Sequence, residues 1–161
     1  MKFAVAMARY AITGVPLAQM RMAASLAARG HQVDLIVGSI AEGMDVPVLN
    51  GVRTLHFSRP KARYLFFDMV RYLRQENPDV IFSAEDHLNA IVLASAIASR
   101  SRAKISGSSR VNPYDTYSRK VLSKRWFLKL VMRSLMWRAN VLTCVSKDMV
   151  EQYRTLFRNA P

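Results

Sequence analysis

The chain has 161 residues, of which 51% are hydrophobic, so it is long enough to bury a core and too apolar to be disordered throughout. Its single cysteine, Cys144, excludes a disulfide framework, and no apolar run approaches the roughly 20 residues that a membrane-spanning helix needs. The net charge of +13 indicates an anionic partner, which could be nucleic acid, phospholipid headgroups or a phosphorylated substrate. A basic face that only keeps the protein soluble is the alternative.

The N-terminal residues predict a β-α-β unit. An apolar run, Phe3 to Ala8, leads through a loop containing Gly14 into a helix that Gly30 ends, and a second apolar run covers Val33 to Val37. The first turn of such a unit aims a helix N-terminus at the carboxyl edge of a parallel sheet, where phosphorylated ligands commonly bind. Arg9 interrupts the first apolar run too early for a signal peptide, so we expect a cytoplasmic protein.

The β-α pattern continues to the C-terminus. The remaining predicted strands cover 52–57, 79–84, 104–107 and 141–145, and the predicted helices cover 61–75, 87–99, 118–138 and 147–157. About six apolar strands that alternate with helices predict an α/β fold, because parallel strands need crossover connections. The sequence therefore predicts a Rossmann-like, doubly wound parallel sheet with helices on both faces.

The first loop is the first candidate binding site. It lacks the full G-x-G-x-x-G pattern, and no P-loop lysine follows, which disfavours a dinucleotide or P-loop site. Gly14, with Thr13 before it, could let backbone N–H groups approach the phosphate or sugar of a ligand. Alternatively, Gly14 only turns the chain.

A polar cluster from Ser83 to Asn89 follows the strand 79–84 directly. Within it, Asp86 and His87 are the candidate catalytic residues, because a carboxylate next to an imidazole can orient or protonate it. Asp86 is equally suited to capping the helix that follows.

Two later strands also end in polar residues that could bind an anion or an acceptor. Arg110 can pair with phosphate or carboxylate through two hydrogen bonds, and Asn112 offers a donor and an acceptor. Ser146 and Lys147 follow the last strand, and we favour an N-cap for Ser146. A solvent-facing side chain is the alternative for Arg110. No residue pattern predicts a metal site.

The predicted helix 118–138 carries a basic stripe on one side, formed by Arg125, Lys129 and Arg133. On the opposite side it carries an apolar stripe that is predicted to face the core, formed by Phe127, Val131 and Leu135. Trp126 lies at the margin between them. A basic stripe flanked by tryptophan is typical of a helix that lies on an anionic membrane, although marginal aromatic residues also pack in ordinary cores.

Three stretches of the chain resemble the N-terminal domain of the family-four (group 1) glycosyltransferases, which have the GT-B fold. GVPLAQMRMAASLAARGHQVDLIVG is similar to the family's glycine loop, first helix and second strand. NPDVIFSAEDHLNAIVLASAIA is similar to its "PDVI…H" strand and helix, and RANVLTCVSKDMVEQY to the strand and helix near the end of the domain.

The resemblance implies that this chain is one half of a GT-B fold and that it binds the acceptor. In the complete enzyme a sugar would pass, with retention of configuration, from a nucleotide-sugar to a lipid-linked or polysaccharide acceptor at the cytoplasmic membrane face. The nucleotide-sugar is a co-substrate, and no cofactor is implied. By position, Gly14 matches the family's glycine near the donor phosphates, His87 matches its sugar-contacting histidine, and Arg110 and Asn112 lie in its acceptor-side loop.

Two departures qualify the resemblance. The family usually has a second glycine beside the position of Gly14, where this chain has Thr13 and Val15. The sequence also ends at Pro161, where the donor-binding half would begin. We therefore expect 1–161 to be a single N-terminal domain that is inactive alone and is completed by a C-terminal domain or a partner in trans, with a homodimer as another possibility.

The alternative function is a non-catalytic basic module for an anionic membrane, nucleic acid or a partner subunit. Recognised nucleic-acid signatures are absent from the sequence.

Overall fold

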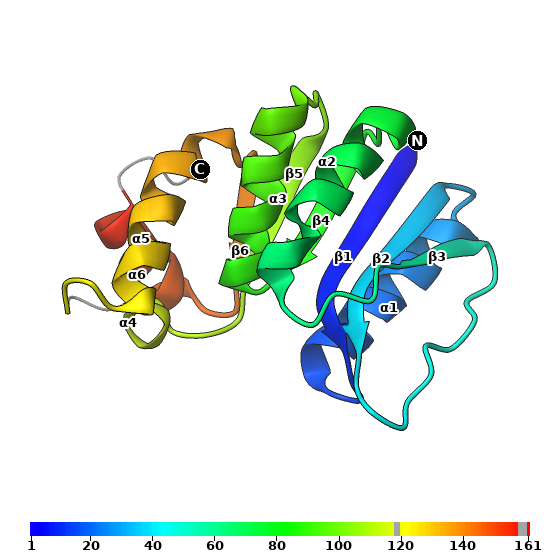
Figure 1. The fold of residues 1–161 in the computed structure, drawn as a ribbon, viewed down its shortest axis with the longest axis horizontal. Helices are drawn as coiled ribbons and strands as arrows, with labels where there is room; N and C mark the ends of the chain where they lie inside the picture. The colour runs from blue at the N-terminus through cyan, green and yellow to red at the C-terminus, as the bar shows by residue number, and fades with distance from the viewer. Residues whose placement is uncertain (118–119, 158–160) are drawn as a thin grey trace.

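The computed structural model describes residues 1–117, 120–157 and 161, and its centre is a six-stranded sheet in the order β3-β2-β1-β4-β5-β6 (Figure 1). The strands are Lys2–Tyr10 (β1), Gln32–Ile40 (β2), Val52–His56 (β3), Val80–Ala84 (β4), Lys104–Ser109 (β5) and Val141–Cys144 (β6). Every neighbouring pair is parallel. The predicted α/β, doubly wound fold is confirmed.

Helices cover both faces of this sheet. They are Gly14–Ala28 (α1), Leu65–Glu76 (α2), Asp86–Ser99 (α3), Pro113–Thr116 (α4), Lys124–Leu135 (α5) and Lys147–Leu156 (α6), with 3₁₀ turns at Ala62–Tyr64 (η1) and Met136–Arg138 (η2). Figure 1 shows α2 and α3 in front of the sheet and α1 behind it. The order of strands reverses between β1 and β4, and ligands of open α/β sheets bind at the carboxyl side of such a reversal.

The core has two parts, one on each face of the sheet. In β1, Ala4 and Ala6 belong to the cluster under α2, α3 and α5, whereas Val5 and Met7 belong to the cluster under α1. Side chains of a strand alternate between faces, so a strand that is covered on both sides is apolar throughout. This double burial explains why the inner strands β1 and β2 read as nearly continuous apolar runs in the sequence.

One glycine is required by close packing in this core. A Cβ at Gly38 of β2 would overlap the carbonyl oxygen of Ala8 and stand 2.8 Å from Cδ1 of Leu65. The absence of a side chain at this position lets the start of α2 approach the centre of the sheet.

The basic helix begins later than predicted. The sequence predicts one helix over 118–138, of which 118 and 119 lie outside the described residues, but α5 starts only at Lys124. The hydroxyl of Ser123 accepts a hydrogen bond from the Trp126 N–H at 3.1 Å, which caps the helix at this point. The preceding residue, Leu122, has a φ of 65°, a left-handed conformation in which an α-helix does not continue.

Helix α5 is also rotated about its axis relative to the prediction. Val131 and Leu135 pack against the core as predicted, but Phe127 is 63% exposed, so that prediction was wrong. Met132 is fully buried instead, and Leu128 packs beside it against the same core. A helical pattern defines stripes, but contact with the neighbouring α3 decides which stripe becomes buried.

Candidate functional site

A cavity of about 190 Å³ opens at the carboxyl edge of the sheet, beside the reversal between β1 and β4. Its lining comes from five parts of the chain: Val15 of α1, Glu85, Asp86 and His87 after β4, Arg110 and Val111 after β5, Thr116 of α4, and Leu128 of α5. The structure thus brings Asp86, His87 and Arg110 to one cavity, next to the start of α1. Asn112, Ser146 and Lys147 do not line it.

His87 is paired with a carboxylate that the sequence analysis did not single out. The His87 side chain is 52% exposed, and its Nε2 atom lies 3.2 Å from Oε2 of Glu85. At this distance the carboxylate can orient the imidazole ring. The signal available in the sequence was the place of Glu85 in the same polar cluster, two residues before the histidine.

The backbone of Glu85 adopts a conformation that non-glycine residues rarely take, with φ 78° and ψ 129°. Its N–H donates to the carbonyl of Ser108 at 3.1 Å, and its carbonyl accepts from the N–H groups of Leu88 and Asn89 at 3.0 and 2.9 Å. These bonds to β5 and to the first turn of α3 hold the residue in place. Strain of this kind persists only where the surrounding structure imposes it, and it concentrates at functional sites.

Asp86 does not cap α3, because Glu85 occupies the N-cap position and Asp86 is the first helical residue. The Asp86 carboxylate is only 5% exposed and accepts hydrogen bonds from the hydroxyls of Tyr153 at 2.8 Å and Ser109 at 3.1 Å. Burial raises the pKa of the Asp86 carboxyl, although these two hydrogen bonds oppose the rise. The side chain therefore joins the start of α3 to β5 and α6, and its catalytic role stays a prediction.

The glycine of the first loop is not needed to turn the chain. Thr13 is the N-cap of α1 but makes no side-chain capping bond, and both Thr13 and Gly14 are exposed. Gly14 does not have a left-handed backbone, and nothing lies within 4 Å of the place where its Cβ would stand. The space beside Gly14, at the N-terminus of α1, is therefore open.

Arg110 is exposed and borders two hollows. Its Nε donates to Oγ of Ser108 at 3.2 Å, and its side chain lines both the cavity beside His87 and a recess of about 150 Å³. Ser106, Ser108 and Thr143 contribute to this second recess. A guanidinium in this place can reach an anionic ligand in either hollow.

The other predicted anion-binding residues begin short helices or lie at their first turn. Asn112 Oδ1 accepts from the Tyr114 N–H at 2.9 Å and caps α4. The Ser146 hydroxyl accepts from the Met149 N–H at 3.3 Å, which confirms the predicted N-cap of α6. Lys147, the first residue of α6, is exposed. Ligand binding by these residues stays a prediction.

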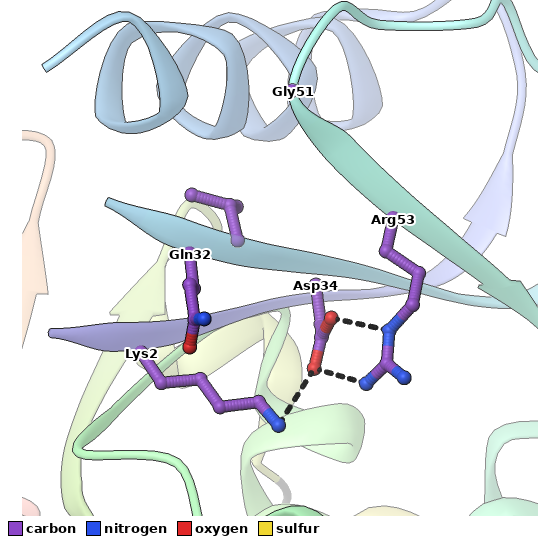
Figure 2. Close-up of a pocket in the computed structure, with 6 residues that line it drawn as sticks. Lys2, Gln32, Asp34, Gly51 and Arg53 are labelled. Carbon is purple, nitrogen blue, oxygen red and sulfur yellow. Dashed lines mark hydrogen bonds and ion pairs between the residues drawn. The ribbon is translucent and has the colours of Figure 1, made fainter. Parts of the chain in front are cut away.

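A larger recess, of about 300 Å³, lies at the opposite, amino edge of the sheet (Figure 2). Arg53 donates to both oxygens of Asp34 at 2.8 Å, and the Tyr72 hydroxyl donates to the same carboxylate at 2.8 Å. Lys2 and Arg53 both also pair with Glu76. Burial alone would raise the pKa of Asp34, but these partners hold it below its usual value. The charges here satisfy one another and join β1, β2, β3 and α2.

The basic helix presents charge and apolar surface together. Arg125 and Arg133 of its basic stripe are exposed, whereas Lys129 and Trp126 are partly buried. Among the described residues of α5 and its flanks, five large apolar side chains are exposed: Val121, Leu122, Phe127, Leu130 and Trp137. Among the described helices, none is long and apolar enough to cross a membrane. Within residues 1–117, 120–157 and 161, no three His, Cys, Asp or Glu side chains are grouped so that they could hold a metal ion.

A family model described as "Glycosyl transferase 4-like domain" matches residues 13–161. The chain belongs to this glycosyl transferase 4-like family. The match covers the glycine loop, the polar cluster after β4 and the residues after β5 and β6, and it confirms the family resemblance that the three stretches predict. A search of the curated proteins finds no match for this sequence.

Two solved structures share the fold of this family member. The lipopolysaccharide outer core galactosyltransferase WaaB matches 97% of this chain and 42% of its own, with a TM-score of 0.65 and 12% identity. Sucrose-phosphate synthase from Thermosynechococcus elongatus matches 99% of this chain and 46% of its own, with a TM-score of 0.69 and 12% identity. The chain thus spans less than half the length of either glycosyltransferase, and it corresponds to one Rossmann-like half of the GT-B fold.

Proposed function

We propose that this chain is the acceptor-binding N-terminal domain of a retaining glycosyltransferase, which transfers a sugar from a nucleotide-sugar to a lipid-linked or polysaccharide acceptor. The observation that carries this proposal is the convergence of His87, Arg110 and the N-terminus of α1 at one cavity. The cavity lies where the strand order reverses, the place at which α/β sheets bind ligands. Membership of the glycosyl transferase 4-like family supports glycosyl transfer as the chemistry.

In this function His87 contacts the transferring sugar, and Asp86 assists by holding the start of α3 in place. The open N-terminus of α1 at Thr13 and Gly14 receives the donor phosphates, whose charge is favourable at the positive end of a helix dipole. Arg110 binds an anionic group of the acceptor or donor. Asn112, Ser146 and Lys147 supply further polar groups at the same edge.

The test is a His87→Ala substitution in the protein as its source cell makes it. Glycolipids and polysaccharides from the variant cells are compared by mass spectrometry with those of the wild type, and we expect one sugar to be missing. His56→Ala is the matched control, because His56 is an exposed histidine at the end of β3, the far edge strand. Unchanged glycans in cells that hold normal amounts of the His87→Ala protein contradict the proposal.

The donor-binding half is a second domain, joined to this chain or supplied in trans. Support comes from the two solved glycosyltransferases, in which the match to this chain covers 42% and 46% of the length. Alone, residues 1–161 should then show little or no sugar transfer. The intact mass of the cellular protein decides the arrangement. A mass near 18.2 kDa points to a partner in trans, which includes a second copy of this chain. A mass about twice as large points to a joined C-terminal domain.

We also propose that α5 docks the protein on the anionic inner face of the cytoplasmic membrane. The argument is the combination of exposed Arg125 and Arg133 with exposed Phe127 and Leu130 on one helix. Cationic side chains attract anionic lipid, while apolar side chains enter the headgroup boundary.

Sedimentation with vesicles tests this membrane docking. Binding is expected to vesicles containing phosphatidylglycerol and not to neutral ones, and a triple substitution of Arg125, Lys129 and Arg133 to Glu should abolish it. The control is a triple substitution to Glu of Arg21, Arg29 and Lys61, which are exposed and lie outside α5. It changes the net charge by the same amount as the α5 substitutions and should retain most binding to the vesicles. Salt-sensitive binding to oligonucleotides instead of vesicles would favour the alternative, a non-catalytic nucleic-acid module.

A further inference from the structure

We propose that Glu85 is a positioning residue, which holds the imidazole of His87 in the orientation that the site uses. The inference rests on the proposed function, because it treats His87 as the residue that contacts the sugar. It adds a residue, Glu85, that the sequence analysis did not place in the site.

The first argument is the contact itself. Glu85 Oε2 lies 3.2 Å from His87 Nε2, and both side chains line the same cavity. This is the only ion pair that Glu85 makes within the described residues. The neighbouring carboxylate of Asp86 accepts from the hydroxyls of Ser109 and Tyr153, whereas the carboxylate of Glu85 makes the ion pair with His87.

The second argument is the choice of residue at this backbone position. With a φ of 78°, position 85 would be occupied with less strain by glycine, which has no Cβ. The chain nevertheless carries a long, charged side chain here. Since a glycine would relieve the strain, backbone stability does not account for a glutamate at this position, whereas the contact with His87 gives its side chain a role.

The third argument is rigidity. The backbone of Glu85 is held from both sides, by the carbonyl of Ser108 and by the amides of Leu88 and Asn89. His87 is on the same first turn of α3. The carboxylate and the imidazole therefore project from one fixed frame, and both side chains line the cavity.

Two variants separate a positioning role from a structural one. Glu85→Gly removes the side chain and relieves the backbone, whereas Glu85→Gln keeps the strain and removes the charge. We expect Glu85→Gly to raise the midpoint of urea unfolding and Glu85→Gln to leave it nearly unchanged. In the complete enzyme, both should lower sugar transfer at least about tenfold, mainly in kcat. A purely structural residue would instead change stability and transfer in the same direction.

An NMR measurement tests the contact without activity. The chain has three histidines, so the side-chain ¹⁵N signals of His31 and His56 serve as internal references. In both Glu85 variants we expect the His87 signals to shift and broaden while the reference signals stay in place. Glu151→Gln, which changes an exposed acid on α6, is the matched control and should leave all three unchanged.

The outcomes distinguish this inference from the proposed function. Unchanged His87 signals in both Glu85 variants, or full transfer by a stabilised Glu85→Gly protein, would overturn the inference and leave the proposed function standing. Full transfer by His87→Ala overturns the proposed function instead, whatever the Glu85 variants do. Shifted His87 signals together with reduced transfer support the inference.

Discussion

The carboxylate of Asp86 and the hydroxyl of Tyr153 meet at 2.8 Å in the interior, although 67 positions of sequence separate the two residues. This bond connects the first residue of α3 with the last helix, α6. Ser109 donates to the same carboxylate from the end of β5. A buried polar cluster therefore fixes the relative positions of the start of α3, the end of β5 and α6, and its member Asp86 lines the cavity with His87.

Replacing Tyr153 by Phe tests this cluster. The substitution removes one of the two hydroxyls bound to Asp86 and leaves a buried oxygen short of a partner, which should cost about 1–3 kcal/mol of unfolding free energy. Urea denaturation measures the change. Tyr114→Phe is the control, because Tyr114 is exposed, and its effect should stay within about 0.5 kcal/mol. Equal stability of the two variants would contradict a stabilising role for the Asp86 cluster.

Asp34 should make the protein sensitive to acid. Its pKa is held below its usual value in the folded state, so its ion pairs and hydrogen bonds contribute stability that is present above about pH 4, the unfolded value. That stability is lost as the pH falls through the lower, folded pKa. Unfolding free energies between pH 2 and 7 should therefore drop more steeply in the wild type than in Asp34→Asn. Asp45→Asn, an exposed acid, should retain the wild-type profile.

Asp86 should make the unfolding free energy depend on pH in the opposite direction to Asp34. Its folded pKa is raised by burial, so the folded state binds a proton more tightly than the unfolded state does. The stability that results is fully present below the unfolded pKa of about 4 and is lost as the pH rises through the folded pKa. Asp86→Asn cannot ionise, so its stability relative to the wild type should improve as the pH rises through this window. A constant difference between the two proteins over that range would exclude a raised pKa.

Gly14→Ala should separate ligand binding from folding. No atom stands near the added methyl, and alanine is the better helix former, so we expect unchanged stability or a gain of up to about 1 kcal/mol. If the donor phosphates approach this turn, transfer by the complete enzyme should fall because the methyl occupies their space. Gly38→Ala is the contrasting case: its Cβ would overlap Ala8, so it should destabilise the fold by about 1–3 kcal/mol.

The sequence by itself determined the architecture of this protein. Strands covered on both faces must be apolar throughout, so β1, β2 and β4 were visible as apolar runs, and the helices between them implied parallel order. The N-cap at Ser146 was also predictable, because a cap is a contact between residues three positions apart. Local patterns of this kind need no knowledge of the remaining chain.

Only the tertiary structure decided how the site is built. The pairing of Asp86 with Tyr153 depends on the packing of distant segments, which spacing along the chain does not encode. The rotation of α5, which buries Met132 and exposes Phe127, depends on contact with α3. The role of Glu85 was hidden because the sequence does not show that its φ is positive. The hydrogen bonds of Glu85 to β5 and to the first turn of α3 hold that backbone angle, and the contact between the side chains of Glu85 and His87 is seen only in the folded structure.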